Sequence, residues 1–319
     1  MSNSIPDFTI ALWATNLAHP AKDRAMWLAL VEAQILEAKR QGAQLLVMPE
    51  YVSAHWLHWA ERPMSGAPLM NWMAAEGAAL LPEIELLVTR HRIGLVAGSM
   101  PVLAAADRED LGTLNRAWIL LPQEDGTLRR LHHDKLVPTP PERATGDWPI
   151  RLGTRVAPFE FRGARMAVLI CLDVEMPAVA AKLQDQALDL LIVPSMTAQL
   201  SGYHRVFDCA KARAVELFAA VATVGCVGEA PQNQGSNCSG ASLFLPCEMH
   251  LGGTGRAAEI APQSSADGPG PMLVTNVPLA ALRRSRRHAE AWPGPFDAAE
   301  ITIGDSDEPA HIPRVSAAK

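Results

Sequence analysis

The sequence predicts an α/β fold built as one domain. Short apolar runs typical of buried strands alternate along the chain with longer stretches whose apolar residues recur at helical spacing. Hydrophobic residues make up 49% of the 319 residues and charged residues 19%, so the chain can bury a large core. No segment has the composition of an interdomain linker, and no repeat with a period of about 20 to 50 residues is visible. We therefore expect a single α/β domain over residues 1–304, followed by a tail at 305–319.

The first half of this domain alternates strands with helices and then forms a hairpin. In the first predicted helix Trp27, Val31 and Ile35 lie at helical spacing, and Gly42 follows its end. The predicted elements are a strand at 8–14, a helix at 20–40, a strand at 45–48, a helix between 68 and 92, and strands at 94–99, 115–121 and 127–131. Asp125-Gly126 indicates a turn between the last two strands, so the sheet should contain antiparallel as well as parallel pairs.

The second half repeats the alternation. The predicted elements are a strand at 165–170, a helix at 177–187, a strand at 190–193, a helix at 206–219, and strands at 221–227, 240–245 and 273–277. Residues 252–271 are rich in Gly, Pro and Ser and predict a loop between the last two strands.

Charge and hydropathy exclude several classes of partner. The formal net charge is −6, and the one Arg cluster, Arg283 to Arg287, is too short to form a nucleic-acid-binding surface. No apolar run reaches the roughly 18 residues of a membrane span, and the first residues lack the pattern of a signal peptide. We expect a cytoplasmic protein with no nucleic-acid or membrane partner.

The five cysteines predict neither a disulfide framework nor a structural zinc site. They are odd in number, form no CxxC pair, and have no His or Cys at zinc-ligand spacing. His55 and His58 lie three residues apart, but no third ligand accompanies them. We therefore expect no metal and no cofactor.

Residues with useful chemistry follow the predicted strands. Glu50 and Cys171 each come directly after an apolar run, and Lys135 begins a loop that ends at Glu142. A thiol becomes a strong nucleophile when a base takes its proton or a cation stabilises its charge. A sharp turn after Cys171 would also aim the backbone N–H of Leu172 at an oxyanion. Taken singly, each residue also fits a structural role: a buried Cys, a capping Glu, a surface Lys.

Three motifs, taken together in chain order, indicate more than the single residues do. Leu45 to Glu50 (LLVMPE), His133 to Leu136 (HDKL) with Glu142, and Val168 to Asp173 (VLICLD) continued by Glu175-Met176-Pro177 resemble the signature of the nitrilase superfamily of carbon–nitrogen hydrolases. The resemblance extends over roughly residues 7–292. It implies that Glu50 is the general base, Lys135 the catalytic lysine, Cys171 the nucleophile and Glu142 a second active-site glutamate. It also implies that the Leu172 amide helps form the oxyanion hole.

The same resemblance implies an architecture and a reaction. The expected fold is a four-layer α-β-β-α sandwich whose subunits pair into a homodimer or larger homo-oligomer. The expected reaction is hydrolysis of a small-molecule amide through a thioester on Cys171. Hydrolysis of a nitrile or of an N-carbamoyl (ureido) substrate, acyl transfer to another amine, and a catalytically idle binding protein are the alternatives. Gly202 to Arg205 and Leu282 to Arg284 resemble a branch whose relatives sometimes carry a fused acetyltransferase domain.

Several neighbouring residues have open roles. Five residues after the base could line a pocket or pack under a loop: Tyr51, His55, Trp56, His58 and Trp59. Glu142 could orient the substrate, hold Lys135 or be a solvated loop residue. Two carboxylates near one lysine should have pKa values pushed apart. Thr197 follows a strand end where family members shape the substrate pocket, and Arg213 and Glu216 predict a structural ion pair.

Overall fold

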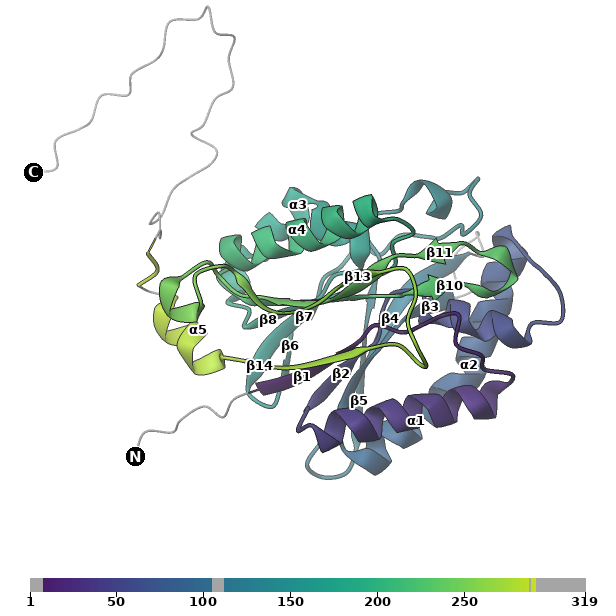
Figure 1. Ribbon diagram of the computed structural model, residues 1–319, viewed down its shortest axis with the longest axis horizontal. Helices are drawn as coiled ribbons and strands as arrows, with labels where there is room; N and C mark the ends of the chain where they lie inside the picture. Colours follow the sequence, from purple (N-terminus) through teal and green to yellow (C-terminus); the bar gives the residue numbers. More distant parts are fainter. Residues whose placement is uncertain (1–7, 105–111, 287, 291–319) are drawn as a thin grey trace, which may run out of the picture.

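Two facing sheets form the centre of the molecule. The computed structural model describes residues 8–104, 112–286 and 288–290. In this part of the chain two six-stranded mixed sheets lie face to face, with helices on both outer faces (Figure 1). The α-β-β-α sandwich is therefore confirmed. The predicted tail at 305–319 lies outside the described residues, and a single domain over residues 1–304 stays a prediction.

The first sheet has three parallel strands flanked by antiparallel neighbours. Its strands, in spatial order, are β14 (Met272–Val277), β1 (Phe8–Trp13), β2 (Leu45–Val47), β3 (Gly94–Leu103), β4 (Thr113–Pro122) and β5 (Leu128–Asp134). Strands β1, β2 and β3 run parallel, while β14 and the β4–β5 hairpin are antiparallel to their neighbours. The carboxyl ends of β2 and β5 thus come to the same edge of this sheet.

The second sheet repeats this pattern with different strands. Its spatial order is β13 (Arg256–Gln263), β12 (Ser239–Phe244), β9 (Ala220–Gly225), β8 (Leu190–Ser195), β7 (Ala164–Val168) and β6 (Phe159–Phe161). Strands β7, β8 and β9 are parallel, and the other pairs are antiparallel. A two-stranded ribbon of β10 (Gly228–Glu229) and β11 (Ser236–Asn237) lies beside the sheet.

Helices cover the outer faces. The α-helices are α1 (Arg24–Arg40) and α2 (Gly66–His91) on the first sheet, α3 (Pro177–Ala181) and α4 (Leu200–Glu216) on the second, and α5 (Leu279–Ser285) after β14 (Figure 1). Helix α1 begins where Asp23 accepts a hydrogen bond from the Met26 amide, and it buries Trp27, Val31 and Ile35 at the predicted spacing. None of the helices in the described ranges has both the length and the apolar character that crossing a membrane requires.

Short 3-10 turns connect these elements and carry part of the site. They are η1 (Val52–Trp59), η2 (Pro140–Glu142), η3 (Cys171–Glu175), η4 (Gln184–Gln186), η5 (Pro231–Asn233) and η6 (Met249–Leu251).

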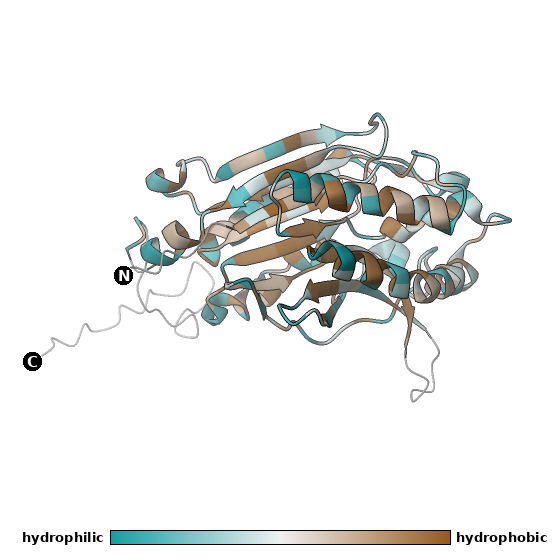
Figure 2. Cartoon of the chain, turned by 90° about the horizontal axis from the view of Figure 1, so that it is seen from below, coloured by the Kyte–Doolittle hydropathy of each residue, from teal (hydrophilic) through white to brown (hydrophobic). Residues whose placement is uncertain are grey.

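The core lies between the sheets and beneath the helices. Leu12, Val47 and Ile119 of the first sheet belong to the same buried cluster as Val168 and Ile192 of the second. Figure 2 shows hydrophobic residues along the central strands and hydrophilic ones on outward helix surfaces. Full burial of such a side chain contributes about 1.5–3 kcal/mol. This apolar layer fixes how the two sheets sit against each other.

The sequence prediction was wrong in the stretch 252–271, and the predicted helix at 177–187 was too long. Strand β13 lies inside the predicted loop; its alternate residues are only half buried, and it pairs in a ladder with β12 alone. Pro262 is tolerated there because an edge strand need not donate every N–H. Helix α3 ends at Ala181 rather than 187, and the chain turns through η4 to a left-handed Ala187. Strand β6 and helix α5 were not predicted.

Candidate active site

Strand ends from both sheets bring the four predicted side chains together. Glu50 lies just after β2, Lys135 just after β5, Glu142 in η2, and Cys171 at the start of η3 after β7. Their exposed fractions are 2%, 1%, 3% and 5%. Three ionisable side chains and a thiol therefore share one nearly dry site.

Lys135 is the centre of this group. Its Nζ lies 2.8 Å from Oε1 of Glu50 and 2.6 Å from Oε2 of Glu142. The same oxygen of Glu142 accepts from the amide of Thr139 at 2.9 Å and from its hydroxyl at 2.7 Å. Glu142 is thus a fixed anchor for the lysine, and not a solvated loop residue.

Cys171 sits in a strained backbone conformation at the tip of its turn. Its φ is 48°, in the left-handed region that non-glycine residues seldom adopt. Its Sγ faces the carbonyl oxygen of Met196 at 3.8 Å. The amide of Leu172 lies in the first turn of η3, where backbone N–H groups have no partner within the helix.

Asn115, near the start of β4, joins the two carboxylates. Its Nδ2 donates to Oε1 of Glu50 at 3.0 Å and to Oε1 of Glu142 at 3.2 Å. Within the described residues its own Oδ1 has no hydrogen-bond partner. Sequence reasoning missed Asn115, because it begins the predicted strand at 115–121 and is followed by the charged Arg116, so a polar residue there gave no distinct signal.

A bulge in β3 supports the segment that carries Glu50. The ladder between β3 and β4 shifts register between Val96 and Ser99. Ser99 then donates its amide to the Pro49 carbonyl at 3.2 Å, and its Oγ accepts from the amide of Tyr51 at 3.0 Å. A Cβ on Gly98, whose φ is 63°, would lie 2.2 Å from the carbonyl oxygen of Pro49, so only glycine fits there.

Burial and the lysine shift the pKa values of the two carboxyl groups in opposite directions, as the sequence predicted. Burial raises the pKa of Glu50, and the nearby charge of Glu142 adds to this, against the opposing effect of Lys135. Burial also works against ionisation of Glu142, but the charge and hydrogen bond of Lys135, with the Thr139 contacts, bring its pKa below its ordinary value. The two carboxylates outweigh burial and raise the pKa of Lys135.

The thiol is held in its neutral form. Burial, reinforced by the charge of Glu50, raises the pKa of Cys171 well above its ordinary value. A neutral thiol needs a base beside it, and a carboxylate with a raised pKa is the stronger proton acceptor. Oε1 of Glu50 is occupied by Lys135 and Asn115, which leaves Oε2 for that proton.

A small cavity opens onto these side chains. Its volume is about 170 Å³. It is lined by Glu50, Tyr51, Lys135, Thr139, Pro141, Glu142, Trp148, Met196, Ala198, Gln234, Ser236 and Asn237. Cys171 is not itself in this lining and lies next to it, against Met196. Among the lining residues Lys135 is the one cation, and both of its carboxylate partners lie in the same wall.

Comparison with known proteins assigns the chain to a family. The model of the carbon-nitrogen hydrolase family matches residues 10–249, which include all four of these side chains. The chain belongs to the carbon-nitrogen hydrolase family. A probable hydrolase of Bacillus subtilis (strain 168), YhcX, is 28% identical over 204 residues, which are 63% of this chain and 37% of that protein. The resemblance to a branch whose relatives sometimes carry a fused acetyltransferase domain stays a prediction.

Solved members of this carbon-nitrogen hydrolase fold superpose over most of the chain. An amidase from Nesterenkonia sp. is 21% identical with a TM-score of 0.63, covering 89% of this chain and 96% of its own. A variant of the Nesterenkonia sp. AN1 amidase in complex with butyramide is also 21% identical, with a TM-score of 0.60 and coverages of 88% and 94%. At this identity the likeness establishes the fold.

Of the five aromatic and histidine residues singled out after Glu50, only Tyr51 reaches this group of side chains. Its hydroxyl donates to Oε1 of Glu142 at 2.9 Å. Trp56 instead packs edge-on against Trp27. His55 contacts the carbonyl of His19, and burial lowers its pKa to about 4. His58 contacts the carbonyl of Leu17 and Trp59 contacts Glu76, so neither lines the cavity.

Two further predictions concern α4 and the strand before it. Arg213 and Glu216 form the expected ion pair at 2.6 Å, and Arg213 Nε also donates to the Val174 carbonyl in η3 at 3.0 Å. Helix α4 therefore braces the turn that carries Cys171. Thr197 is not among the residues that line the cavity, and its hydroxyl donates to the Cys238 carbonyl at 2.7 Å.

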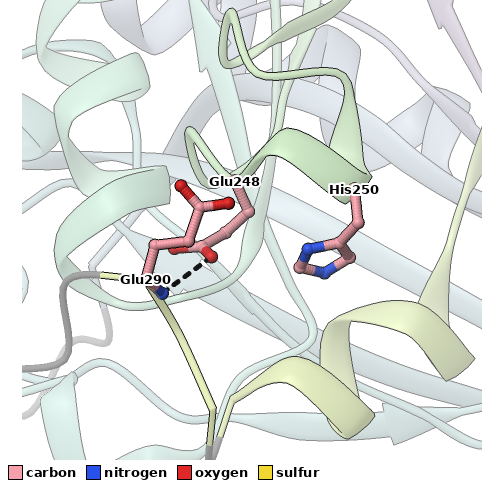
Figure 3. A group of neighbouring side chains, drawn as sticks. All are labelled: Glu248, His250 and Glu290. Carbon is pink, nitrogen blue, oxygen red and sulfur yellow. Dashed lines mark hydrogen bonds between the residues drawn. The ribbon is translucent and has the colours of Figure 1, made fainter.

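Among the described residues, one group of potential metal ligands lies away from this site. Glu248, His250 and Glu290 have ligand atoms within 4.8 Å of one another (Figure 3). Glu248 accepts the amide of Glu290, and Glu290 accepts the amide of Met249, both at 2.9 Å. The group follows β12, whose end pairs with the start of β9, so it lies away from the strand ends that carry the site. It has no part in the chemistry below.

Proposed function

We propose that the protein hydrolyses the carbon–nitrogen bond of a small uncharged amide, releasing an acid and ammonia or an amine. The observation that supports this most is the convergence of Glu50, Lys135 and Cys171 in one buried group beside the 170 Å³ cavity. A base, a cation and a thiol at one place are what acyl transfer through a thioester requires.

The first half of the reaction forms the thioester. Glu50 takes the thiol proton as Cys171 Sγ bonds to the amide carbon, and the carbonyl electrons move onto oxygen. Lys135 and the amide of Leu172 stabilise that oxyanion. When the oxyanion collapses, the carbon–nitrogen bond breaks, and Glu50 returns its proton to the leaving nitrogen, which departs as ammonia or amine.

The second half hydrolyses the thioester. A water molecule loses a proton to Glu50 as its oxygen attacks the acyl carbon, and the same donors meet the second oxyanion. The carbon–sulfur bond then breaks, the acid leaves, and the proton on Glu50 goes to the Cys171 sulfur. Glu142 holds Lys135 throughout at 2.6 Å, so the ammonium need not be repositioned between the two halves.

The charge of the cavity wall favours an uncharged substrate over a ureido acid. A ureido acid carries a carboxylate that needs a cation, because an unpaired charge is costly to bury. Lys135 is already paired with Glu50 and Glu142, and no other Lys or Arg among the described residues lines the cavity. Trp148, Met196 and Pro141 instead offer apolar surface to a short acyl chain.

Three substrates of similar size test the proposal. Ammonia release is measured from butyramide, butyronitrile and N-carbamoylglycine, with acid quench and mass spectrometry of the Cys171 peptide. Butyramide is chosen because the related amidase variant was solved with it. We expect ammonia and a butyryl group on Cys171 from the amide, and neither from Cys171→Ala.

The other outcomes distinguish the alternatives. Turnover of the nitrile alone, or of the ureido acid alone, would replace the amide with that substrate class. A hydroxamate formed at the expense of acid when hydroxylamine is added would indicate acyl transfer. No ammonia from any of the three, together with a Cys171 inert to iodoacetamide, would leave a catalytically idle binding protein.

We also infer a homodimer or larger assembly in the cytoplasm. The low charged fraction, 19%, supports a subunit interface. A monomer mass by light scattering at micromolar concentration would contradict the assembly.

A further inference from the structure

We propose that Asp173 is a positioning residue that holds the nucleophile turn and the lysine segment in register. This carboxylate lies two residues after Cys171 and is fully buried. It contacts neither the cavity nor the reacting groups. Its contacts go instead to backbone amides on both sides of the site.

One oxygen of Asp173 holds the chain just after Lys135. Oδ1 accepts from the amide of Leu136 at 3.0 Å and from the amide of Val137 at 2.9 Å. These two residues follow β5 of the first sheet, while Asp173 itself follows β7 of the second. The carboxylate therefore ties the two sheets together at the edge where the site lies.

The other oxygen holds the chain just before Cys171. Oδ2 accepts from the amide of Ile170 at 3.1 Å and faces Nε2 of His133 at 3.3 Å. The amide of Asp173 in turn donates to the Ile170 carbonyl at 3.0 Å. Two hydrogen bonds thus bracket Cys171 and oppose relaxation of its left-handed backbone, whose φ is 48°.

A single acidic side chain therefore controls two distances. It fixes where Sγ points and how far the lysine segment lies from it. Both must hold within about 1 Å for efficient attack, because rates fall steeply with misplacement of reacting atoms. This inference rests on the proposed function for its kinetic readout, but the geometry of the thiol can be measured without any substrate.

The test compares Asp173→Asn with Asp189→Asn. Asparagine is nearly isosteric, but its amide nitrogen would face N–H donors at either oxygen position of Asp173. Asp189 is an equally buried carboxylate directly before β8, away from the site, and it accepts from the amide of Arg165 at 2.9 Å and from Arg283. It serves as the matched control for losing a buried carboxylate.

Two readouts separate positioning from simple destabilisation. We expect Asp173→Asn to lower kcat for butyramide at least 100-fold with KM changed less than threefold, and to change the rate of Cys171 alkylation by iodoacetamide at least tenfold. Asp189→Asn should lower Tm by a similar amount yet keep both rates within threefold of wild type. All rates are measured well below each variant's Tm.

The other possible results of this comparison would overturn the proposal or limit it. Equal effects of the two variants on kcat and alkylation would overturn the proposal, as would full activity of Asp173→Asn. If Asp173→Asn does not fold, Asp173→Ser takes its place; if neither folds while Asp189→Asn does, the residue serves folding and the proposal is wrong. If the wild type releases no ammonia, the proposed function fails, and the alkylation rates alone decide the role of Asp173.

Discussion

Replacing the general base by its amide should separate activity from stability. In Glu50→Gln the side-chain oxygen can still accept from Lys135 and Asn115, at the present 2.8 and 3.0 Å, and the new NH₂ takes the place of the free oxygen. The variant cannot take up the thiol proton. Loss of a general base lowers turnover about 10²- to 10⁴-fold, which is about 2.7–5.4 kcal/mol of barrier.

The same change should leave the fold intact or stabilise it. Glu50, Glu142 and Lys135 together carry one excess negative charge in a nearly dry site, and the substitution removes it. Replacing a buried charge in this way is neutral or stabilising, here by zero to about 2 kcal/mol. For a domain of this size that raises Tm by zero to about 6 °C.

The stability gained by Glu50→Gln should depend on pH. Because the folded-state pKa of Glu50 is raised, the wild type loses the associated stability as the pH rises through that pKa, and the glutamine variant does not. The Tm advantage of Glu50→Gln should therefore be small near pH 4 and largest near pH 7.

Ammonia release from butyramide and differential scanning calorimetry at several pH values measure both effects. Turnover within tenfold of wild type, or a Tm lower by more than about 5 °C at pH 7, would refute the reasoning.

Two further predictions concern the groups around the base. Lys135→Met leaves two buried carboxylates without their cation and should lower the free energy of unfolding by about 3–5 kcal/mol at pH 7. The Tm of this variant should recover as the pH falls, because protonation removes both charges. A Tm independent of pH would contradict this. Gly98→Ala forces a Cβ to within 2.2 Å of the Pro49 carbonyl and should lower kcat by displacing Glu50. Its control, Gly163→Ala, has a similar φ of 78° but open space around the new Cβ, so it should lose stability and keep kcat; equal kcat losses would disprove the link to Glu50.

Much of the fold was predictable because its central strands are strongly apolar and its helices amphipathic. The edges were not: β13 is half exposed, contains Pro262, and derives its ladder hydrogen bonds from β12 alone. Local pattern cannot indicate a strand that depends mainly on its neighbour. The predicted α3 was too long, because the chain leaves the helix after Ala181 and turns through η4 before it reaches the left-handed Ala187.

The candidate site was predictable where its residues follow strand ends. Glu50, Lys135 and Cys171 satisfied that rule, whereas Glu142 lies seven residues beyond Lys135 and was predicted from its resemblance to a family motif. Asn115 did not, because it lies within a strand and acts through contacts with residues 65 and 27 positions away. Such a contact depends on which strands become neighbours, and this information is not carried by the residue's local sequence.

Because the site is built from two separate sheets, substitutions in the core between the sheets should alter its geometry. Glu50 and Lys135 are attached to the first sheet and Cys171 to the second, so the spacing between base and nucleophile is set by the apolar contacts of residues such as Val47 and Val168. Trimming one of those side chains would alter turnover through geometry, even though the chemistry lies several residues away. Turnover should therefore change with the distance between the sheets.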